Sequence, residues 1–150
     1  MKPAGDRTDR KILNVLLEDA GASYREVARK AGVSVGTVLN RMKKLRSTKV
    51  IRKSTLLLDY EKLGYGIPVL IDVRVSRGKL LEVETAIARN PHVFAVYDVT
   101  GDFDSVILAR FRERGDLDRF VKDLQKMEFV ERTNTKLILN AVKEEAPRFP

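Results

Sequence analysis

The sequence predicts an α+β protein with a helix-turn-helix module in residues 1–53, a strand and hinge linker in residues 54–66, and a βαββαβ module in residues 67–150. Two observations predict this organisation. Apolar residues recur at helical spacing in the first module and alternate in the manner of strands in the last. The charge divides similarly, because residues 1–60 carry 14 Lys and Arg against 6 Asp and Glu, whereas residues 61–150 carry 15 of each.

The first helix is expected over residues 6–20, where apolar side chains share one face. These side chains are Ile12, Leu13, Leu16, Leu17 and Ala20. A capping box predicts the start of the second helix, since Ser23 and Glu26 lie three residues apart and can bond each other's backbone N–H groups. Gly32 is expected to end that helix, because the C-cap position takes a left-handed backbone that glycine adopts without steric cost.

Ser34 is expected to cap a third helix, whose core side repeats through Val35, Val38, Met42 and Leu45. The residues expected to contact DNA on this helix are Ser34, Gly36, Thr37, Asn40, Arg41, Lys43 and Lys44. Small residues permit close approach to base edges, and Asn and Arg make bidentate contacts to adenine and guanine. Two short helices joined by a tight turn, with this basic face, predict a helix-turn-helix that binds double-stranded DNA. A solvated charged helix on an ordinary helical domain is the simpler alternative.

The linker combines a strand-like segment, Val50–Asp59, with a short ordered hinge, Tyr60–Gly66. Arg52 and Lys53 are expected to contact DNA phosphates, although a solvated turn explains them equally well.

The last module alternates strands with helices. Strands are expected at Ile67–Val75, Val93–Thr100, Asp104–Phe111 and Thr133–Val142, and helices around Leu80–Ile87 and Leu117–Met127, the second capped by Asp116. This order is the split βαβ, or ferredoxin-like, arrangement.

Both faces of the predicted sheet are apolar, although its helices can cover only one. In the second strand, Phe94 and Val96 alternate with Ala95 and Tyr97. An antiparallel sheet with one face in water carries polar residues there. We therefore expect a homodimer through the open face, which also provides two helix-turn-helix modules for two DNA half-sites.

Composition excludes several other classes. The absence of cysteine removes disulfides, thiol catalysis and cysteine-ligated zinc, and no metal-ligand cluster is recognisable, so no metal or cofactor is expected. The longest apolar run is Val93–Tyr97, and the N-terminus has no signal-peptide core, which predicts a cytoplasmic protein without a membrane span. His92 is the only histidine, and no Ser/His/Asp set or phosphate loop occurs, so the chain is not expected to be an enzyme.

The chain resembles the prokaryotic Lrp/AsnC (leucine-responsive regulator, feast/famine) family over nearly its whole length. Similar segments are the opening helix Asp9–Leu13, the helix and turn Glu26–Ser34, the recognition helix Val38–Leu45, the exit residues Val50-Ile51 and Leu63-Gly64, and the turn Gly101–Asp104. The chain departs from the family at Arg46–Lys49, where an acidic residue and a glycine usually precede Val-Ile. The departure affects the turn geometry expected there, not the fold.

The resemblance implies a transcriptional regulator whose dimers assemble into tetramers or octamers and bind a small effector, commonly an amino acid, between dimers. The effector residues it implies are Gly101, Asp102, Asp104, Thr133 and Thr135, and Asp118 is added as a further carboxylate expected nearby. Amides after the glycine would hold a carboxylate, and the acids an ammonium group. The surplus of acids gives a weak preference for lysine or arginine. From the residues alone, a hairpin turn is the favoured explanation of Gly101–Asp104, and Asp118 suits the start of a helix by its charge alone.

The alternative is a stand-alone ligand-binding or assembly protein that uses its basic head on RNA or as a docking surface. RNA readers usually expose stacking aromatic residues. Tyr24 is the only aromatic residue among the first 59, which favours DNA.

Overall fold

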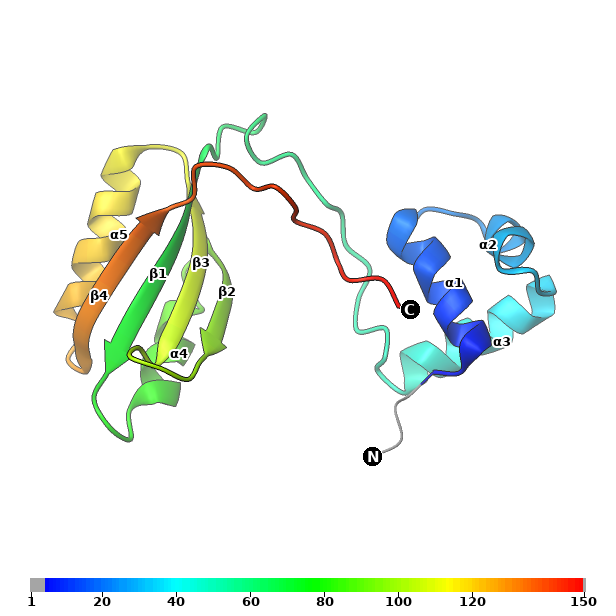
Figure 1. Cartoon of the computed structure of the whole chain (residues 1–150), viewed down its shortest axis with the longest axis horizontal. Helices are drawn as coiled ribbons and strands as arrows, with labels where there is room; N and C mark the ends of the chain where they lie inside the picture. The colour runs from blue at the N-terminus through cyan, green and yellow to red at the C-terminus, as the bar shows by residue number, and fades with distance from the viewer. Residues whose placement is uncertain (1–4, 150) are drawn as a thin grey trace. The chain divides into compact units, whose positions relative to one another are not determined.

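The computed structural model describes residues 5–149, which divide into two compact units (Figure 1). One unit, here called the head, contains the chain up to Leu57 together with the segment from Lys143 onward. The other, here called the body, is Leu58–Val142. The grouping of the C-terminal segment with the head was not expected from the sequence.

Residues 1–4 and 150, which the predicted modules 1–53 and 67–150 include, lie outside the described part of the chain. Within that part, no helix is long and apolar enough to cross a membrane.

Three helices form the head: α1 (Arg7–Glu18), α2 (Tyr24–Ala31) and α3 (Val35–Ser47). The predicted capping box of α2 is confirmed, since Glu26 N–H donates to Ser23 Oγ at 3.3 Å and Ser23 N–H donates to Glu26 Oε2 at 2.8 Å. The bond from Ser23 N–H, together with one from the Ser23 hydroxyl to Glu26 Oε2 at 2.9 Å, holds the pKa of Glu26 below its usual range. Gly32 ends α2 with φ 69°, and Ser34 caps α3, both as predicted.

The core of the head lies between the three helices. Its buried members are Ile12, Val15, Val27, Ala28, Ala31, Val38 and Met42. Three of the apolar residues expected inside are exposed: Leu17 is 42% exposed, Val35 is 39% exposed, and Ala20, which lies beyond the end of α1, is exposed as well. Val35 is the first residue of α3, where a side chain can point past the core instead of into it.

The body contains β1 (Ile67–Val75), α4 (Leu80–Ile87), β2 (Val93–Asp98), β3 (Ser105–Phe111), α5 (Arg114–Lys126) and β4 (Val130–Leu137). This confirms the predicted βαββαβ order. The four-stranded sheet has the order β2-β3-β1-β4, and each neighbouring pair is antiparallel. The helices α4 and α5 lie on one face of the sheet and leave the other uncovered (Figure 1).

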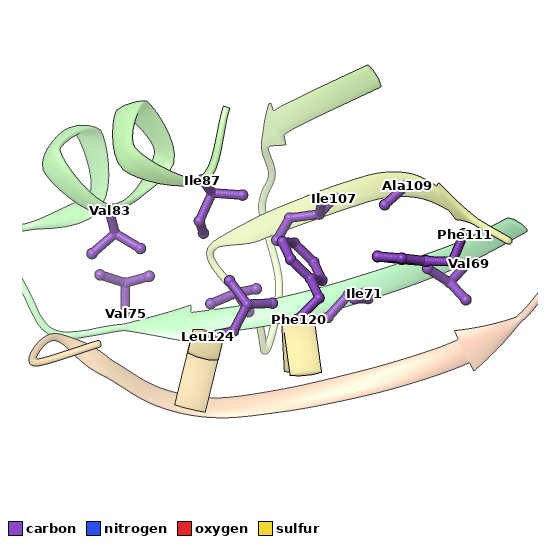
Figure 2. Close-up of a cluster of buried hydrophobic side chains, with 11 residues drawn as sticks. Val69, Ile71, Val75, Val83, Ile87, Ile107, Ala109, Phe111, Phe120 and Leu124 are labelled. Carbon is purple, nitrogen blue, oxygen red and sulfur yellow. The ribbon is translucent and has the colours of Figure 1, made fainter. Parts of the chain in front are cut away.

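The body core fills the space between the sheet and these helices, as Figure 2 shows. Alternate residues of β1, including Val69 and Ile71, point into it and are fully buried. Phe111 packs against Phe120 of α5, with ring centroids 5.3 Å apart. This packing fixes which face of each strand is available for other roles.

Several predicted boundaries are wrong. The final strand begins at Val130 and ends at Leu137, not at Thr133 and Val142. Glu113, not Asp116, precedes the first turn of α5, where Asp116 instead pairs with Arg119.

The predicted linker strand is also wrong for a single chain, since the described residues 52–59 contain no strand. Strand-like residues stay unpaired there because no neighbouring strand in the described chain supplies the ladder hydrogen bonds that a β-strand requires.

The hinge after residue 59 is ordered, as predicted. Its turn is closed by a bond from Tyr65 N–H to the Tyr60 carbonyl at 2.8 Å. The Arg110 and Arg112 guanidinium groups lie over the Tyr60 and Tyr65 rings, at 5.1 and 4.6 Å from the ring centroids. These cation–π contacts attach the hinge to the end of β3.

Candidate DNA-binding, dimerisation and effector sites

The exposed face of α3 carries most of the side chains expected to contact DNA. Asn40, Lys43 and Lys44 are exposed. At the start of the helix, Ser34 Oγ accepts from Thr37 N–H at 3.1 Å and lies 2.9 Å from Thr37 Oγ1. The capping hydroxyls are thus partly occupied within the helix, while the exposed amide and lysines are available to a ligand.

Gly36 lies on the exposed surface of α3, where the packing of the head does not require a glycine. A Cβ built there would meet only Ser34 Oγ, at 3.9 Å, which is an ordinary contact. Its small size is therefore not needed for packing inside the head. Glycine at this position permits a close approach from outside.

Leu39 is an exposed member of α3 that the sequence interpretation missed, with 50% of its side-chain surface accessible. Together with the half-exposed Val35, it adds an apolar strip to the basic face. Apolar side chains contact the thymine methyl group in the major groove. A break in the core periodicity of α3, with an extra leucine outside the core set, was the available signal.

Arg41 points toward α1. Its Nη1 lies 2.5 Å from an Asp6 carboxylate oxygen and 3.4 Å from both carboxylate oxygens of Asp9, which is buried. The bond from Asp9 N–H lowers the pKa of Asp6, and Arg41 lowers it further. Asp6 in turn raises the pKa of Arg41. The guanidinium expected to read a base is held between two carboxylates of the head.

Arg52 and Lys53 follow α3 within the head and are exposed. The residue before them, Ile51, packs on the head core, and its N–H donates to the Leu45 carbonyl at 3.0 Å. This anchor keeps both cations close to the end of α3.

The uncovered face of the sheet is half apolar and half polar. Its apolar half includes Leu70 and its cross-strand partner Leu108, with Phe94 50% and Tyr97 55% exposed nearby. The polar half centres on Asp72, which accepts from Asn134 Nδ2 at 2.9 Å and lies 2.7 Å from Lys136 Nζ.

Val96, which was expected to share a face with Phe94, packs on the body core instead. The register between β2 and β3 shifts between Val93 and Ala95, and this bulge moves the following residues to the opposite faces.

The turn after β2 uses part of its predicted effector set to hold itself together. Asp104 Oδ2 accepts from Val75 N–H at 2.8 Å, and Asp104 N–H donates to the Val73 carbonyl at 3.0 Å. Gly101 has φ 127°, a conformation that favours glycine. Asp102 is exposed, and its carbonyl accepts from Arg74 Nη1 at 3.3 Å. Asp102 is therefore the acid of this turn that remains accessible.

The remaining predicted effector residues are engaged elsewhere in the body. Thr133 Oγ1 accepts from Gln125 Nε2 of α5 at 3.2 Å, and Thr133 and Thr135 pair in register with core residues of β1. Their side chains therefore belong to the helix-covered face. Asp118 lies 2.6 Å from Lys122 on α5. A single chain does not gather these three residues around the turn.

Two cations beside the turn were missed by the sequence interpretation. Arg74 and Arg132 pair in register on the uncovered side of the sheet, and the Arg132 guanidinium lies 5.6 Å from the Phe103 ring centroid. The sequence could have predicted this placement, because both arginines alternate with residues that face the core in the same strands. Among residues 5–149, no cluster of three or more His, Cys, Asp or Glu side chains is arranged to hold a metal ion.

Two family profiles match the chain. The profile described as winged helix-turn-helix DNA-binding matches residues 5–52, and the profile described as Lrp/AsnC ligand binding domain matches residues 68–147.

Similar sequences are regulators of transcription. An HTH-type transcriptional regulator of Pyrococcus furiosus is 49% identical over 140 residues, covering 93% of this chain and 95% of the relative. The HTH-type transcriptional regulator FL11 of Pyrococcus horikoshii is 36% identical over 139 residues, covering 93% of this chain and 92% of the relative.

Solved structures have the same fold over almost the whole chain. A transcriptional regulator of Neisseria meningitidis in complex with L-Met superposes with a TM-score of 0.88 at 26% identity, covering 98% of this chain and 97% of the other. E. coli AsnC gives a TM-score of 0.87 at 22% identity, covering 97% and 99%, a likeness that concerns the fold alone.

Proposed function

The chain belongs to the Lrp/AsnC family of helix-turn-helix transcriptional regulators, and from this premise we propose how its parts divide the work. The chain is a DNA-binding regulator, not an enzyme. We propose that α3 reads the major groove, that the uncovered sheet face forms a dimer, and that an amino acid binds at the turn Gly101–Asp104.

The exposed face of α3 is the observation that carries the DNA-reading proposal. Asn40 is the exposed side chain suited to a bidentate contact with adenine, and Leu39 is suited to a thymine methyl. Lys43, Lys44, Arg52 and Lys53 supply charge for phosphates, which positions the helix without reading sequence. Arg41 has a different role in this proposal: it holds α3 against α1.

A mobility-shift titration on random and selected duplexes tests this assignment. Binding should weaken steeply as salt rises, because each phosphate neutralised by a lysine or arginine releases counterions. Asn40→Ala should flatten base preference at one position, whereas Lys53→Ala should weaken binding to all sequences alike. Equal effects of the two variants on all sequences would refute base reading by Asn40.

Dimerisation is supported by the apolar half of the uncovered sheet face. Leu70, Leu108, Phe94 and Tyr97 present neighbouring apolar surface that no element of the body covers. Leu56 and Leu57 in the linker are 79% and 78% exposed, so a second copy would also shield these side chains. Two copies related by a twofold axis then carry two heads for two half-sites. Further assembly to tetramers or octamers is proposed from the family.

Binding of an amino acid is supported by the chemistry of the turn and by the L-Met complex of the Neisseria meningitidis relative. The exposed backbone at Gly101 and the Arg74 side chain offer donors for an α-carboxylate, and the Asp102 carboxylate offers an acceptor for an ammonium group. Because Asp104 is occupied by the Val75 amide, Asp102 is the acid left to favour lysine or arginine. Thr133, Thr135 and Asp118 would join only through a second dimer or a rearrangement.

A thermal-shift screen of the twenty amino acids, with sedimentation as a second readout, tests the effector proposal. A ligand at 100 times its dissociation constant should stabilise the native state by roughly 2.7 kcal/mol. No shift with any amino acid would refute an amino-acid effector and leave the DNA-binding role untouched.

A further inference from the structure

The C-terminal segment, residues 143–149, binds the outer surface of α1. The side-chain amide of Asn14 makes two hydrogen bonds to this segment. Its Nδ2 donates to the Phe149 carbonyl at 2.9 Å, and Phe149 N–H donates to its Oδ1 at 2.9 Å. Figure 1 shows this segment ending beside α1. A paired amide-to-backbone contact fixes both the position and the direction of the segment.

A second contact lies one helical turn further along. Arg148 Nη1 lies 2.8 Å from Glu18 Oε1, and Glu18 follows Asn14 by four residues, so both project from the same stripe of α1. Toward the start of the helix, Arg7 and Lys11 continue the stripe and line a surface hollow beside Phe149. The segment therefore uses a face of α1 that the head core does not need. We call this contact the tail dock.

The C-terminal segment, or tail, and the linker leave the body side by side. The linker enters β1 and the tail leaves β4, and these neighbouring strands pair Val69 with Leu137. The Ile138 N–H then donates to the Pro68 carbonyl at 3.0 Å. The linker joins the helical core of the head at Ile51, which packs on that core, and the tail contacts α1 at Asn14. Two separate segments thus run from one end of the sheet to different anchors on the head.

We propose that the tail dock is a second tether that restricts rotation of each head about its linker and so sets the half-site spacing that a dimer accepts. The proposal rests on the proposed dimeric DNA binding. An attachment through residues 52–58 alone, all exposed, leaves rotation about many backbone bonds. A second attachment removes much of that freedom, and Pro147 stiffens the tail by fixing its own φ and disfavouring helix at Ala146.

The dock is built to be reversible. The Asn14–Phe149 and Glu18–Arg148 contacts are exposed, so they hold chiefly because the tail is covalently attached and its effective concentration at α1 is high. Undocking leaves the head core intact, because neither Asn14 nor Glu18 belongs to the buried cluster.

The experiment uses the full chain with two undocking variants. Asn14→Leu removes both amide bonds, and Arg148→Glu replaces the ion pair with repulsion, which Glu18→Arg should relieve in the double variant. Glu82→Arg, which breaks the exposed Lys79–Glu82 pair on α4, is the matched control. Amide hydrogen exchange at Phe149 reports docking. Binding to duplexes with one half-site, or with two half-sites at graded spacings, reports function.

We expect slow exchange at Phe149 in the wild type and fast exchange in both single undocking variants. The wild type should favour one spacing by about tenfold or more, and the undocked variants should retain less than about threefold preference. Their affinity for one half-site, and the behaviour of Glu82→Arg, should match the wild type, and the double charge swap should restore the preference.

Rapid exchange at Phe149 in the wild type would overturn the tail dock. A spacing preference that is absent in the wild type, or that persists after undocking, would overturn its role as a tether. Failure of the wild type to bind any half-site would instead refute the proposed DNA reading, and the exchange measurement would still decide whether the tail docks.

Discussion

The Arg41 guanidinium lies 2.5 Å from the Asp6 carboxylate, so α3 is hydrogen-bonded to the residue that caps α1. Asp6 performs two tasks at once, since its Oδ1 also accepts from Asp9 N–H at 2.9 Å. One carboxylate therefore links the start of the first helix to the middle of the third. This relationship changes what substitutions on α3 are expected to do.

Arg41→Met should lower the thermal stability of the protein and weaken binding to all duplexes alike. The substitution keeps the aliphatic bulk of the side chain but leaves Asp9, a buried carboxylate, without its cation. Asn40→Ala is the matched comparison, because it should leave stability unchanged and cost about 1–3 kcal/mol of discrimination at one base pair. Thermal unfolding and selection from random DNA separate the two effects. Loss of base preference in Arg41→Met without loss of stability would contradict the proposal that Arg41 holds α3 against α1.

Acidification should weaken the contact between Arg41 and Asp6. The pKa of Asp6 is lowered by the Asp9 N–H bond and by Arg41, so its contribution to stability is complete above the ordinary value of 3.8 and disappears as pH falls through the lowered pKa. Unfolding curves measured from about pH 5 downward should therefore show a smaller loss of stability for Asp6→Asn than for the wild type. Equal losses would show that other carboxylates account for the acid sensitivity.

Gly36→Ala should separate folding from DNA binding. Alanine favours helix over glycine, and the added Cβ meets nothing closer than Ser34 Oγ at 3.9 Å, so stability should rise by no more than about 1 kcal/mol. Affinity for a selected duplex should fall, because the methyl group occupies space that the DNA approaches. Calorimetry and a mobility-shift titration on the same preparation measure both quantities. Undiminished affinity would place Gly36 away from the DNA.

Local chemistry made much of this fold readable from the sequence. The caps at Ser23, Gly32 and Ser34 depend on residues three or four positions apart, and all three are confirmed. What sequence reasoning missed depends on partners that are distant along the chain. The Arg41–Asp6 pair spans 35 residues, and the Phe149–Asn14 pair spans 135. The reversal of Val96 follows from a bulge, which alternation alone does not reveal.

A charge on the uncovered sheet face should separate the proposed dimer. Leu108→Asp places a carboxylate among apolar side chains that a second copy would cover, so sedimentation should show a folded monomer. Leu81→Asp on α4 is the control, because Leu81 is 77% exposed on the helical side of the body. Val96→Asp should instead unfold the body, since Val96 packs on its core. A dimer that survives Leu108→Asp would exclude this face as the interface.

Asp102→Ala is the substitution that tests the effector turn most directly. Asp104→Ala confuses two effects, because the Asp104 carboxylate also binds the Val75 amide and its loss should lower stability before any ligand is added. The Asp102 side chain is exposed, and the hydrogen bond that Asp102 accepts from Arg74 involves its backbone carbonyl. Asp102→Ala should therefore leave the melting temperature without ligand unchanged and reduce the shift caused by the amino acid that stabilises the wild type.

Asp102→Asn adds the electrostatic control for this prediction. It keeps the shape and one acceptor but removes the negative charge, so a shift due to ammonium recognition should fall in both variants, and most for lysine or arginine if the acid sets that preference. The measurement is a titration of each amino acid followed by thermal unfolding at constant salt. An unchanged shift in both variants would place the effector elsewhere in the body, while leaving the DNA-binding assignment of α3 unaffected.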